Sequence, residues 1–301
     1  MIRLEDTSGG AVAAAISAER HRQGSPTTGM VLTMLILTDE EYQSDATSGA
    51  VFAARQHPMR IVTVIPRPGR TGHALDAEIA VGGDDGPGEL AVLRLRGELA
   101  DHANSVVIPL LLSDTPVVAF WPSNAPLVPA EDPIGRHAQR RITDSATSTD
   151  PLEALRERGR GYRPGDTDLA WSRLTPWRSI LAAAFDQRVE KVTGGLIVAD
   201  HDNPSAALLG VWLAHRLKAS IEIQWSDTPG ITSVQLFTEE GEIAVTRPDG
   251  VAATLSRTGI PDALISLPRR DLTTLLNEDL RRLDPDEVYG WVITTFAGET
   301  T

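Results

Sequence analysis

The chain has 301 residues, of which 41% are hydrophobic and 23% charged, which is ordinary for a globular protein of about two domains. Its formal net charge of −13 at pH 7 would repel phosphate backbones, so we expect no nucleic-acid partner. The absence of cysteine excludes disulfide partners, thiolate catalysis and cysteine-ligated metals.

Two features concern the location of the protein. The first six residues lack the basic-then-apolar pattern of a signal peptide. The longest apolar runs, residues 31–37 and 106–112, are too short to span a bilayer. We therefore expect a cytoplasmic protein without a membrane partner.

The N-terminal half predicts alternating helices and strands. Residues 30–37 and 59–65 are continuous apolar runs, typical of strands buried on both faces. Between them, Thr38 is placed as the N-cap of a helix with three acidic residues in its first turn. A strand–helix–strand unit with a short crossover is parallel by default, so the two strands should pair in parallel. The other expected elements are a helix, two strands of a hairpin arm, a further helix and a short strand, at residues 9–23, 75–81, 89–95, 98–112 and 117–121. Pro109 should kink or end the helix over 98–112.

The C-terminal half repeats part of this order. Residues 195–198 and 221–225 are expected strands on either side of a helix over 205–218, which is entered through Asp202 and Asn203. Around this unit we expect a helix, four strands and two closing helices, at residues 176–185, 231–237, 242–246, 251–255, 264–267, 268–283 and 286–295.

The predicted fold class is α/β, with two α/β domains that contain mixed sheets. The N-terminal domain spans residues 1–125 and the C-terminal domain spans 176–301. Residues 126–175 form a connection rich in proline and arginine, with one short helix at 152–158. The shared order of elements suggests a duplicated layout, although strand–helix–strand units also recur by chance.

The usual chemical signatures are missing, so we expect no catalytic residue, cofactor or metal. The turn at residues 38–41 is acidic and glycine-free, unlike a dinucleotide-binding fingerprint. The glycine-rich residues 82–88 lack the Lys-Ser/Thr end of a phosphate-binding loop and favour a hairpin turn. No nucleophile elbow is present, and the seven histidines show no metal-ligand spacing. The polar cluster at residues 200–202 is best interpreted as a helix cap.

Two stretches, residues 134–145 and 166–178, combine several arginines with tryptophans and carry most of the candidate functional side chains. These residue types commonly anchor protein–protein contacts, and arginine also binds phosphate. These stretches could be a solvated face, a partner-docking region, or an anion site for a sugar phosphate built on Arg136, Arg140 and Arg141. Trp171 and Trp177 could instead be buried packing residues. Our candidate partner-binding residues are Arg136, Arg140, Arg141, Asp144, Ser145, Trp171, Arg173, Trp177 and Arg178.

Six stretches carry a resemblance to a known family: residues 77–79 with the following Gly-Gly turn, 93–102, 107–112, 116–122, 134–145 and 166–178. Together the chain resembles the glucose-6-phosphate dehydrogenase assembly protein family, OpcA, of the actinobacterial type. The resemblance covers nearly the whole chain and contains no catalytic signature.

The resemblance implies a non-enzymatic assembly factor and allosteric activator of glucose-6-phosphate dehydrogenase, at the entry to the oxidative pentose phosphate pathway of carbohydrate metabolism. Some relatives are associated with thiol redox control of that enzyme, but this chain has no cysteine to supply the thiol. The alternative from the residues alone is a sugar-phosphate-binding enzyme or metabolite sensor that uses Arg136, Arg140 and Arg141.

Overall fold

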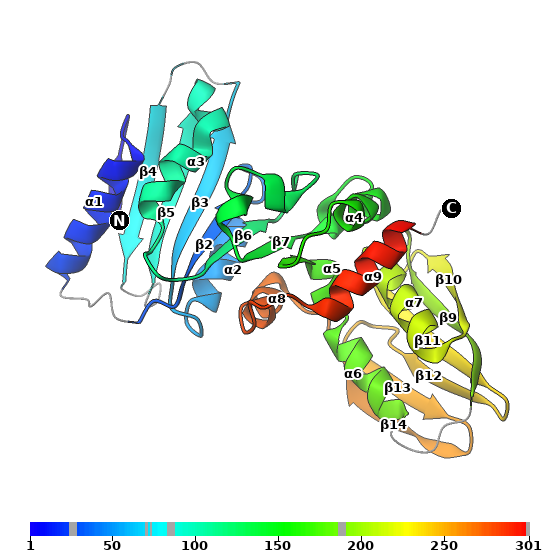
Figure 1. Ribbon diagram of the computed structural model, residues 1–301. Helices are drawn as coiled ribbons and strands as arrows, with labels where there is room; N and C mark the ends of the chain where they lie inside the picture. Colours follow the sequence, from blue (N-terminus) through cyan, green and yellow to red (C-terminus); the bar gives the residue numbers. More distant parts are fainter. Residues whose placement is uncertain (24–28, 70–71, 73, 83–87, 186–190, 299–301) are drawn as a thin grey trace. The chain divides into compact units, whose positions relative to one another are not determined.

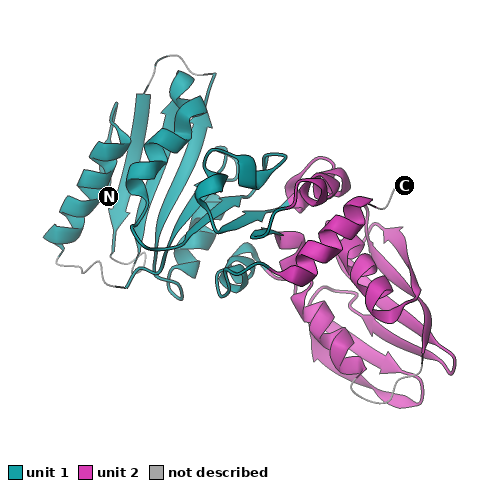
Figure 2. Cartoon of the chain, in the orientation of Figure 1, with its two compact units in different colours: residues 1–144, 163–167, 271–285 teal, residues 145–162, 168–270, 286–301 magenta. Residues whose placement is uncertain are grey.

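A computed structural model of the chain describes residues 1–23, 29–69, 72, 74–82, 88–185 and 191–298 (Figure 1). The chain forms two compact units, each assembled from three stretches (Figure 2). Unit 1 comprises Met1–Asp144, Arg163–Thr167 and Asp271–Pro285, and unit 2 comprises Ser145–Tyr162, Asp168–Arg270 and Asp286–Thr301.

This division differs from the consecutive arrangement expected from the sequence, with domains at 1–125 and 176–301. Residues 126–175, expected as a connection, are distributed between both units. They include strands and helices of their own, because the prolines lie at the starts of helices and in turns, where they interrupt no ladder.

Unit 1 is built on a sheet of eight strands in the order β1-β4-β5-β3-β2-β6-β7-β8. The five strands β5, β3, β2, β6 and β7 are parallel, whereas β1 and β4 add an antiparallel edge. The predicted parallel pairing of the first two buried strands is therefore confirmed. The strands are β1 (Ile2–Leu4), β2 (Leu32–Leu37), β3 (Met59–Arg67), β4 (Ala74–Val81), β5 (Glu89–Arg96), β6 (Val117–Trp121), β7 (Arg140–Thr143) and β8 (Asp166–Asp168).

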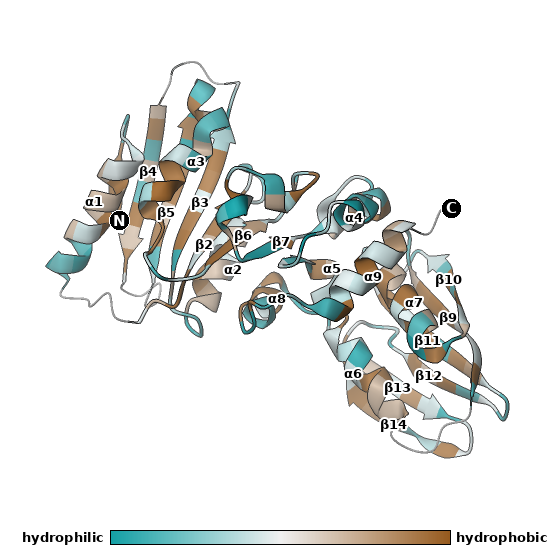
Figure 3. Ribbon diagram, viewed as in Figure 1, coloured by the Kyte–Doolittle hydropathy of each residue, from teal (hydrophilic) through white to brown (hydrophobic). Residues whose placement is uncertain are grey.

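Both faces of the parallel strands are covered. On one face, Leu35 and Val62 pack in a core with Val12 and Ile16 of the first helix. On the other face, the Thr47 hydroxyl lies 2.9 Å from that of Thr63. Burial on both faces explains why β2 and β3 form apolar runs in the sequence and are largely brown in Figure 3. The helices of unit 1 are α1 (Gly9–Arg22), α2 (Gln43–Ala53), α3 (Ala103–Val107) and α8 (Leu272–Asp279), with short 3₁₀ turns η1 (Gly97–His102), η2 (Ile108–Leu110), η3 (Pro129–Glu131) and η4 (Gly135–His137).

Three local predictions for unit 1 need correction or comment. The helix after β2 begins at Gln43, so Thr38 is not its N-cap. The helix expected over residues 98–112 is broken into η1, α3 and η2, with Pro109 inside η2. In the glycine-rich turn, the Gly82 amide donates to the Gly88 carbonyl over 3.0 Å, while residues 83–87 lie outside the described residues.

Unit 2 contains a sheet of six strands in the order β10-β9-β11-β12-β13-β14. β9 and β10, the two strands of the second strand–helix–strand unit, are parallel, and the other strands form an antiparallel meander. The strands are β9 (Val192–Asp200), β10 (Ser220–Ser226), β11 (Ile231–Thr238), β12 (Glu242–Thr246), β13 (Ala252–Arg257) and β14 (Ile260–Ser266). The helical segments are η5 (Ser145–Thr147), α4 (Pro151–Arg160), α5 (Leu169–Ser172), α6 (Thr175–Ala184), α7 (Pro204–Leu217) and α9 (Glu287–Gly298).

The chain is thus an α/β protein with two mixed sheets, which confirms the predicted fold class. The core of unit 2 joins Trp171 and Trp177 to residues of β9, β11 and α7. Among the described residues, the structure contains no helix that could cross a membrane.

Candidate functional site

The carboxyl ends of the parallel strands in unit 1 border a pocket of about 500 Å³. When only the five parallel strands are numbered in chain order, the spatial order β5-β3-β2-β6-β7 reads 3-2-1-4-5. This is the strand order of dinucleotide-binding domains. The order reverses between β2 and β6, and the pocket is lined there by Thr38, Asp39, Ser123 and Asn124. Ligands of doubly wound sheets bind at this switch point, so the pocket is the first place to look for a site.

A dinucleotide-binding domain needs free backbone amides at this point to bind phosphate, but here the Asp39 carboxylate accepts hydrogen bonds from them. Its Oδ1 accepts hydrogen bonds from the backbone amides of Glu41 (3.0 Å) and Tyr42 (3.1 Å). Its Oδ2 accepts from Ser123 Oγ (3.3 Å) and Asn124 Nδ2 (3.2 Å). The donors ahead of α2 are therefore already paired with a negative charge. This arrangement opposes the binding of a pyrophosphate.

The candidate residues Arg140 and Arg141 lie next to each other in β7 and are buried. Arg140 donates to Asp279 Oδ1 over 2.7 Å and to the Asp284 carbonyl over 3.2 Å. Arg141 donates to the Asp166 carboxylate, to the Ala138 carbonyl over 2.7 Å and to the Pro164 carbonyl over 2.6 Å. Both guanidinium groups are thus neutralised within unit 1.

The proposed phosphate site on Arg136, Arg140 and Arg141 is not formed. Successive side chains of a strand point to opposite faces, so Arg140 and Arg141 diverge and bind different carboxylates. Arg136 is exposed on η4 and donates to the Glu131 carbonyl over 3.1 Å. The sequence places the three residues close together but cannot show where their side chains point.

The two tryptophans of the candidate set are each 2% exposed. Trp171 donates from Nε1 to Asp286 Oδ2 over 2.9 Å, and the Arg178 guanidinium carbon lies 3.7 Å from the centroid of its ring. Trp177 packs beneath Arg247, whose guanidinium carbon is 5.0 Å from the ring centroid. Of the two interpretations left open by the sequence, these contacts match buried packing residues.

The other four candidates, Ser145, Asp144, Arg173 and Arg178, differ in how far they are buried. Ser145 is buried and its hydroxyl lies 2.6 Å from Asp168 Oδ2. Asp144, Arg173 and Arg178 are half-buried. Asp144 belongs to unit 1, whereas the other three belong to unit 2.

The carboxylates that pair with this block were not predicted from the sequence. Asp166 and Asp279 pair with the two buried arginines, and Asp168 accepts from the amides of Ser145 (3.0 Å) and Ala170 (2.9 Å). The two aspartates of the Asp-Thr-Asp segment 166–168 could have indicated nearby partners for the arginines. Asp279 could not have been identified from the sequence, because it lies 139 positions away from Arg140.

The strand order and the pocket at its switch point define an α/β protein of the Rossmann-like class. An oxidoreductase from Sinorhizobium meliloti shares this fold with a TM-score of 0.50 at 11% identity, over 89% of this chain and 96% of that chain. A variant of KijD10, a 3-ketoreductase from Actinomadura kijaniata, aligns with a TM-score of 0.49 at 10% identity, over 89% of this chain and 95% of that chain. No match was found among curated proteins.

Two family models match the sequence in succession. The glucose-6-phosphate dehydrogenase subunit N-terminal domain matches residues 50–160 and the corresponding C-terminal domain matches residues 164–293. The chain belongs to the glucose-6-phosphate dehydrogenase assembly protein family, OpcA. Its family therefore indicates a role as a subunit or assembly factor of that dehydrogenase.

Proposed function

We propose that the chain is a non-enzymatic subunit that binds glucose-6-phosphate dehydrogenase and activates it allosterically by stabilising its active oligomer. The family match supports the choice of partner. An added subunit can raise activity only if it binds the active state more tightly than the inactive one. A coupling free energy of about 1–3 kcal/mol is typical of such effects.

The observation that carries the non-enzymatic part of this proposal is the placement of Asp39. A Rossmann-like domain that acts as a dehydrogenase needs its switch-point amides for the cofactor phosphates. Here Asp39 pairs with the Glu41 and Tyr42 amides and also accepts from Ser123 and Asn124. The chain has the strand order of a dinucleotide-binding domain, but the Asp39 carboxylate binds the amides that would otherwise bind a phosphate.

We keep residues 134–145 and 166–178, the arginine- and tryptophan-rich block, as the proposed partner region. Its exposed members would contact the partner, and its buried members would support the fold. Arg136 is exposed and available for direct contact. Buried members such as Arg140 and Trp171 donate internal hydrogen bonds to the Asp279 and Asp286 carboxylates and so support the fold of the region. The proposal also includes a cytoplasmic location and the absence of nucleic-acid, membrane and disulfide partners.

Co-purification and kinetics test the proposed function together. The purified chain, added to purified glucose-6-phosphate dehydrogenase, should co-elute with it in size-exclusion chromatography. It should also lower the KM for glucose 6-phosphate or raise kcat. The chain alone should reduce no NAD(P)⁺ with that substrate. A mixture that never co-elutes and whose kinetic constants do not change across salt and pH would refute the proposal.

A further inference from the structure

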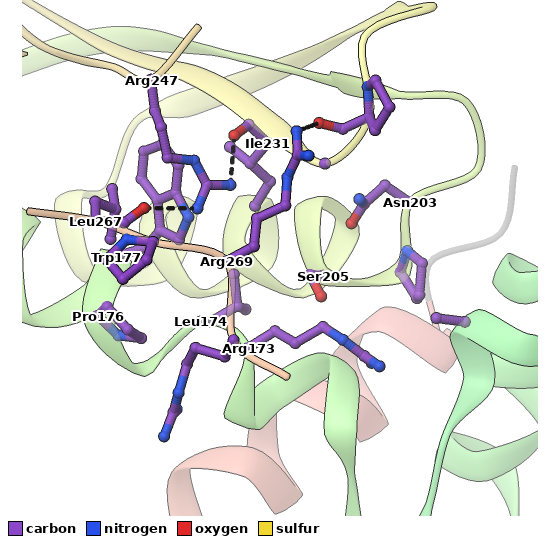
Figure 4. Close-up of a pocket in the computed structure, with 16 residues that line it drawn as sticks. Arg173, Leu174, Pro176, Trp177, Asn203, Ser205, Ile231, Arg247, Leu267 and Arg269 are labelled. Carbon is purple, nitrogen blue, oxygen red and sulfur yellow. Dashed lines mark hydrogen bonds between the residues drawn. The ribbon is translucent and has the colours of Figure 1, made fainter. Parts of the chain in front are cut away.

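Unit 2 contains a second pocket, of about 260 Å³, whose charge is opposite to that of the whole chain (Figure 4). Among the described residues that line it, four are arginines and none is an aspartate or glutamate. The chain itself carries a net charge of −13. The four arginines are Arg173, Arg247, Arg269 and Arg270.

Arg247 is the buried cation of this pocket, with 5% of its surface exposed. It donates to the backbone carbonyls of Leu267 (3.1 Å) and Ile231 (2.8 Å), while its buried Nε has no hydrogen-bond partner. Within the described part of the chain, it forms no salt bridge. Burial, together with the positive charge of Arg269, lowers the pKa of Arg247. The nearby Asp249 carboxylate opposes this shift but forms no salt bridge with Arg247, whose hydrogen bonds among the described residues go to neutral carbonyls, so a bound anion would stabilise the buried guanidinium.

Arg269 provides a second cation close to the first. It donates to the Pro229 carbonyl and, like Arg247, has no salt bridge in the described structure. A Cβ atom at Gly230 would lie 3.3 Å from Arg269 Nε and 3.6 Å from Arg247 Nη2. One point in space is therefore within 4 Å of both guanidinium groups, and glycine leaves that point free of a side chain.

The N-terminus of α7 lines the same pocket through Asn203, Pro204 and Ser205. α7 has 14 residues, so its dipole adds positive potential at this end. The remaining lining includes the apolar side chains of Leu174 and Trp177. The pocket therefore combines a cationic part with an apolar wall.

We propose that this pocket binds a small phosphate-bearing anion, with Arg247 and Arg269 as its main contacts. Guanidinium groups match the oxygens of phosphate, and several cations around one point favour an anion with two negative charges over a single carboxylate. Ligand pockets usually measure roughly 300–1,000 Å³. A pocket slightly smaller than this range suits inorganic phosphate or a compact phosphate monoester.

Isothermal titration calorimetry of the full chain tests this site without the dehydrogenase. The ligands are inorganic phosphate, glucose 6-phosphate as a phosphate monoester, and glucose as the neutral control. The variant is Arg269→Gln, whose exposed side chain leaves the core intact. The matched control is Arg216→Gln, which removes an exposed arginine from the last turn of α7.

We expect the phosphate probes, but not glucose, to bind the wild-type chain. Arg269→Gln should weaken their binding about tenfold or more, since a hydrogen bond to a charged group is lost, while Arg216→Gln should leave it unchanged. Tighter binding of glucose 6-phosphate than of inorganic phosphate would identify a monoester as the ligand, and equal binding would identify free phosphate. The site is refuted if no phosphate probe binds, or if Arg269→Gln, with a wild-type melting temperature, binds as well as wild type.

Discussion

Arg140 in β7 donates a hydrogen bond over 2.7 Å to Asp279, the last residue of α8. The two side chains are 6% and 3% exposed. This buried ion pair joins the last of the parallel strands to α8, through two residues that are 139 positions apart in the chain. α8 also packs on α2, because Gly49 lies against Leu272 and Leu276. The third stretch of unit 1 is therefore fixed at two places.

Arg140→Ala should destabilise unit 1 by about 3–5 kcal/mol, because it removes the arginine of a buried ion pair and leaves the Asp279 carboxylate buried. The free energy of unfolding in urea, followed by circular dichroism, measures this loss. The double variant Arg140→Met with Asp279→Leu should recover much of the stability, since both charges of this buried pair are then removed together. Arg3→Ala is the control, as Arg3 is 74% exposed and should change stability by less than about 0.5 kcal/mol. Equal stability of Arg140→Ala and Arg3→Ala would contradict the role of the pair.

Trp171→Phe should destabilise unit 2 by about 1–3 kcal/mol, because the hydrogen bond from Nε1 to Asp286 is lost in a buried setting. Trp212→Phe is a suitable control, since Trp212 is only partly buried. Thermal unfolding compares the two variants. Dehydrogenase binding, measured well below the melting temperature, should be unchanged by Trp171→Phe. Weaker binding by a fully folded variant would instead support an anchoring role at the interface.

Much of the fold could be predicted because its signals are local. The apolar runs of β2 and β3 and the Asn203 cap before α7 depend on neighbouring residues only. β7 could not be predicted in the same way. Its arginines, 140 and 141, indicate a solvated or docking segment until their distant carboxylates are known.

The candidate sites also differ in whether their signals are local in the sequence. The acidic turn at residues 38–41 is a local signal, because Asp39 accepts hydrogen bonds from the backbone amides two and three residues ahead of it. The cationic pocket of unit 2 gave no sequence signal. Arg173, Arg247 and Arg269 belong to separate segments that meet only in the folded unit.

Asp249 should show an acid-shifted titration. The backbone amides of Val251 (2.8 Å) and Ala252 (3.1 Å) donate to its Oδ1 and hold the pKa of its carboxyl below the ordinary value. The folded chain thus binds this proton less readily than the unfolded chain. The stabilising contribution is present above the unfolded pKa and is lost as pH falls through the folded pKa. Carbon-detected NMR titration measures both values, with the urea-unfolded chain as reference. A folded midpoint at or above the unfolded one would contradict the prediction.

Arg136→Glu should weaken dehydrogenase binding while leaving the chain folded. Arg136 is exposed on η4 and donates a hydrogen bond to the Glu131 carbonyl, so its replacement breaks no buried ion pair among the described residues. Reversal of a charge at an interface rim should slow association and weaken affinity about tenfold, or about 1.4 kcal/mol. Surface plasmon resonance at two salt concentrations measures this change, and the difference from wild type should shrink at the higher concentration. Arg3→Glu applies the same reversal to an exposed residue outside the proposed region. If both variants bind and activate the dehydrogenase like wild type, Arg136 lies outside the interface.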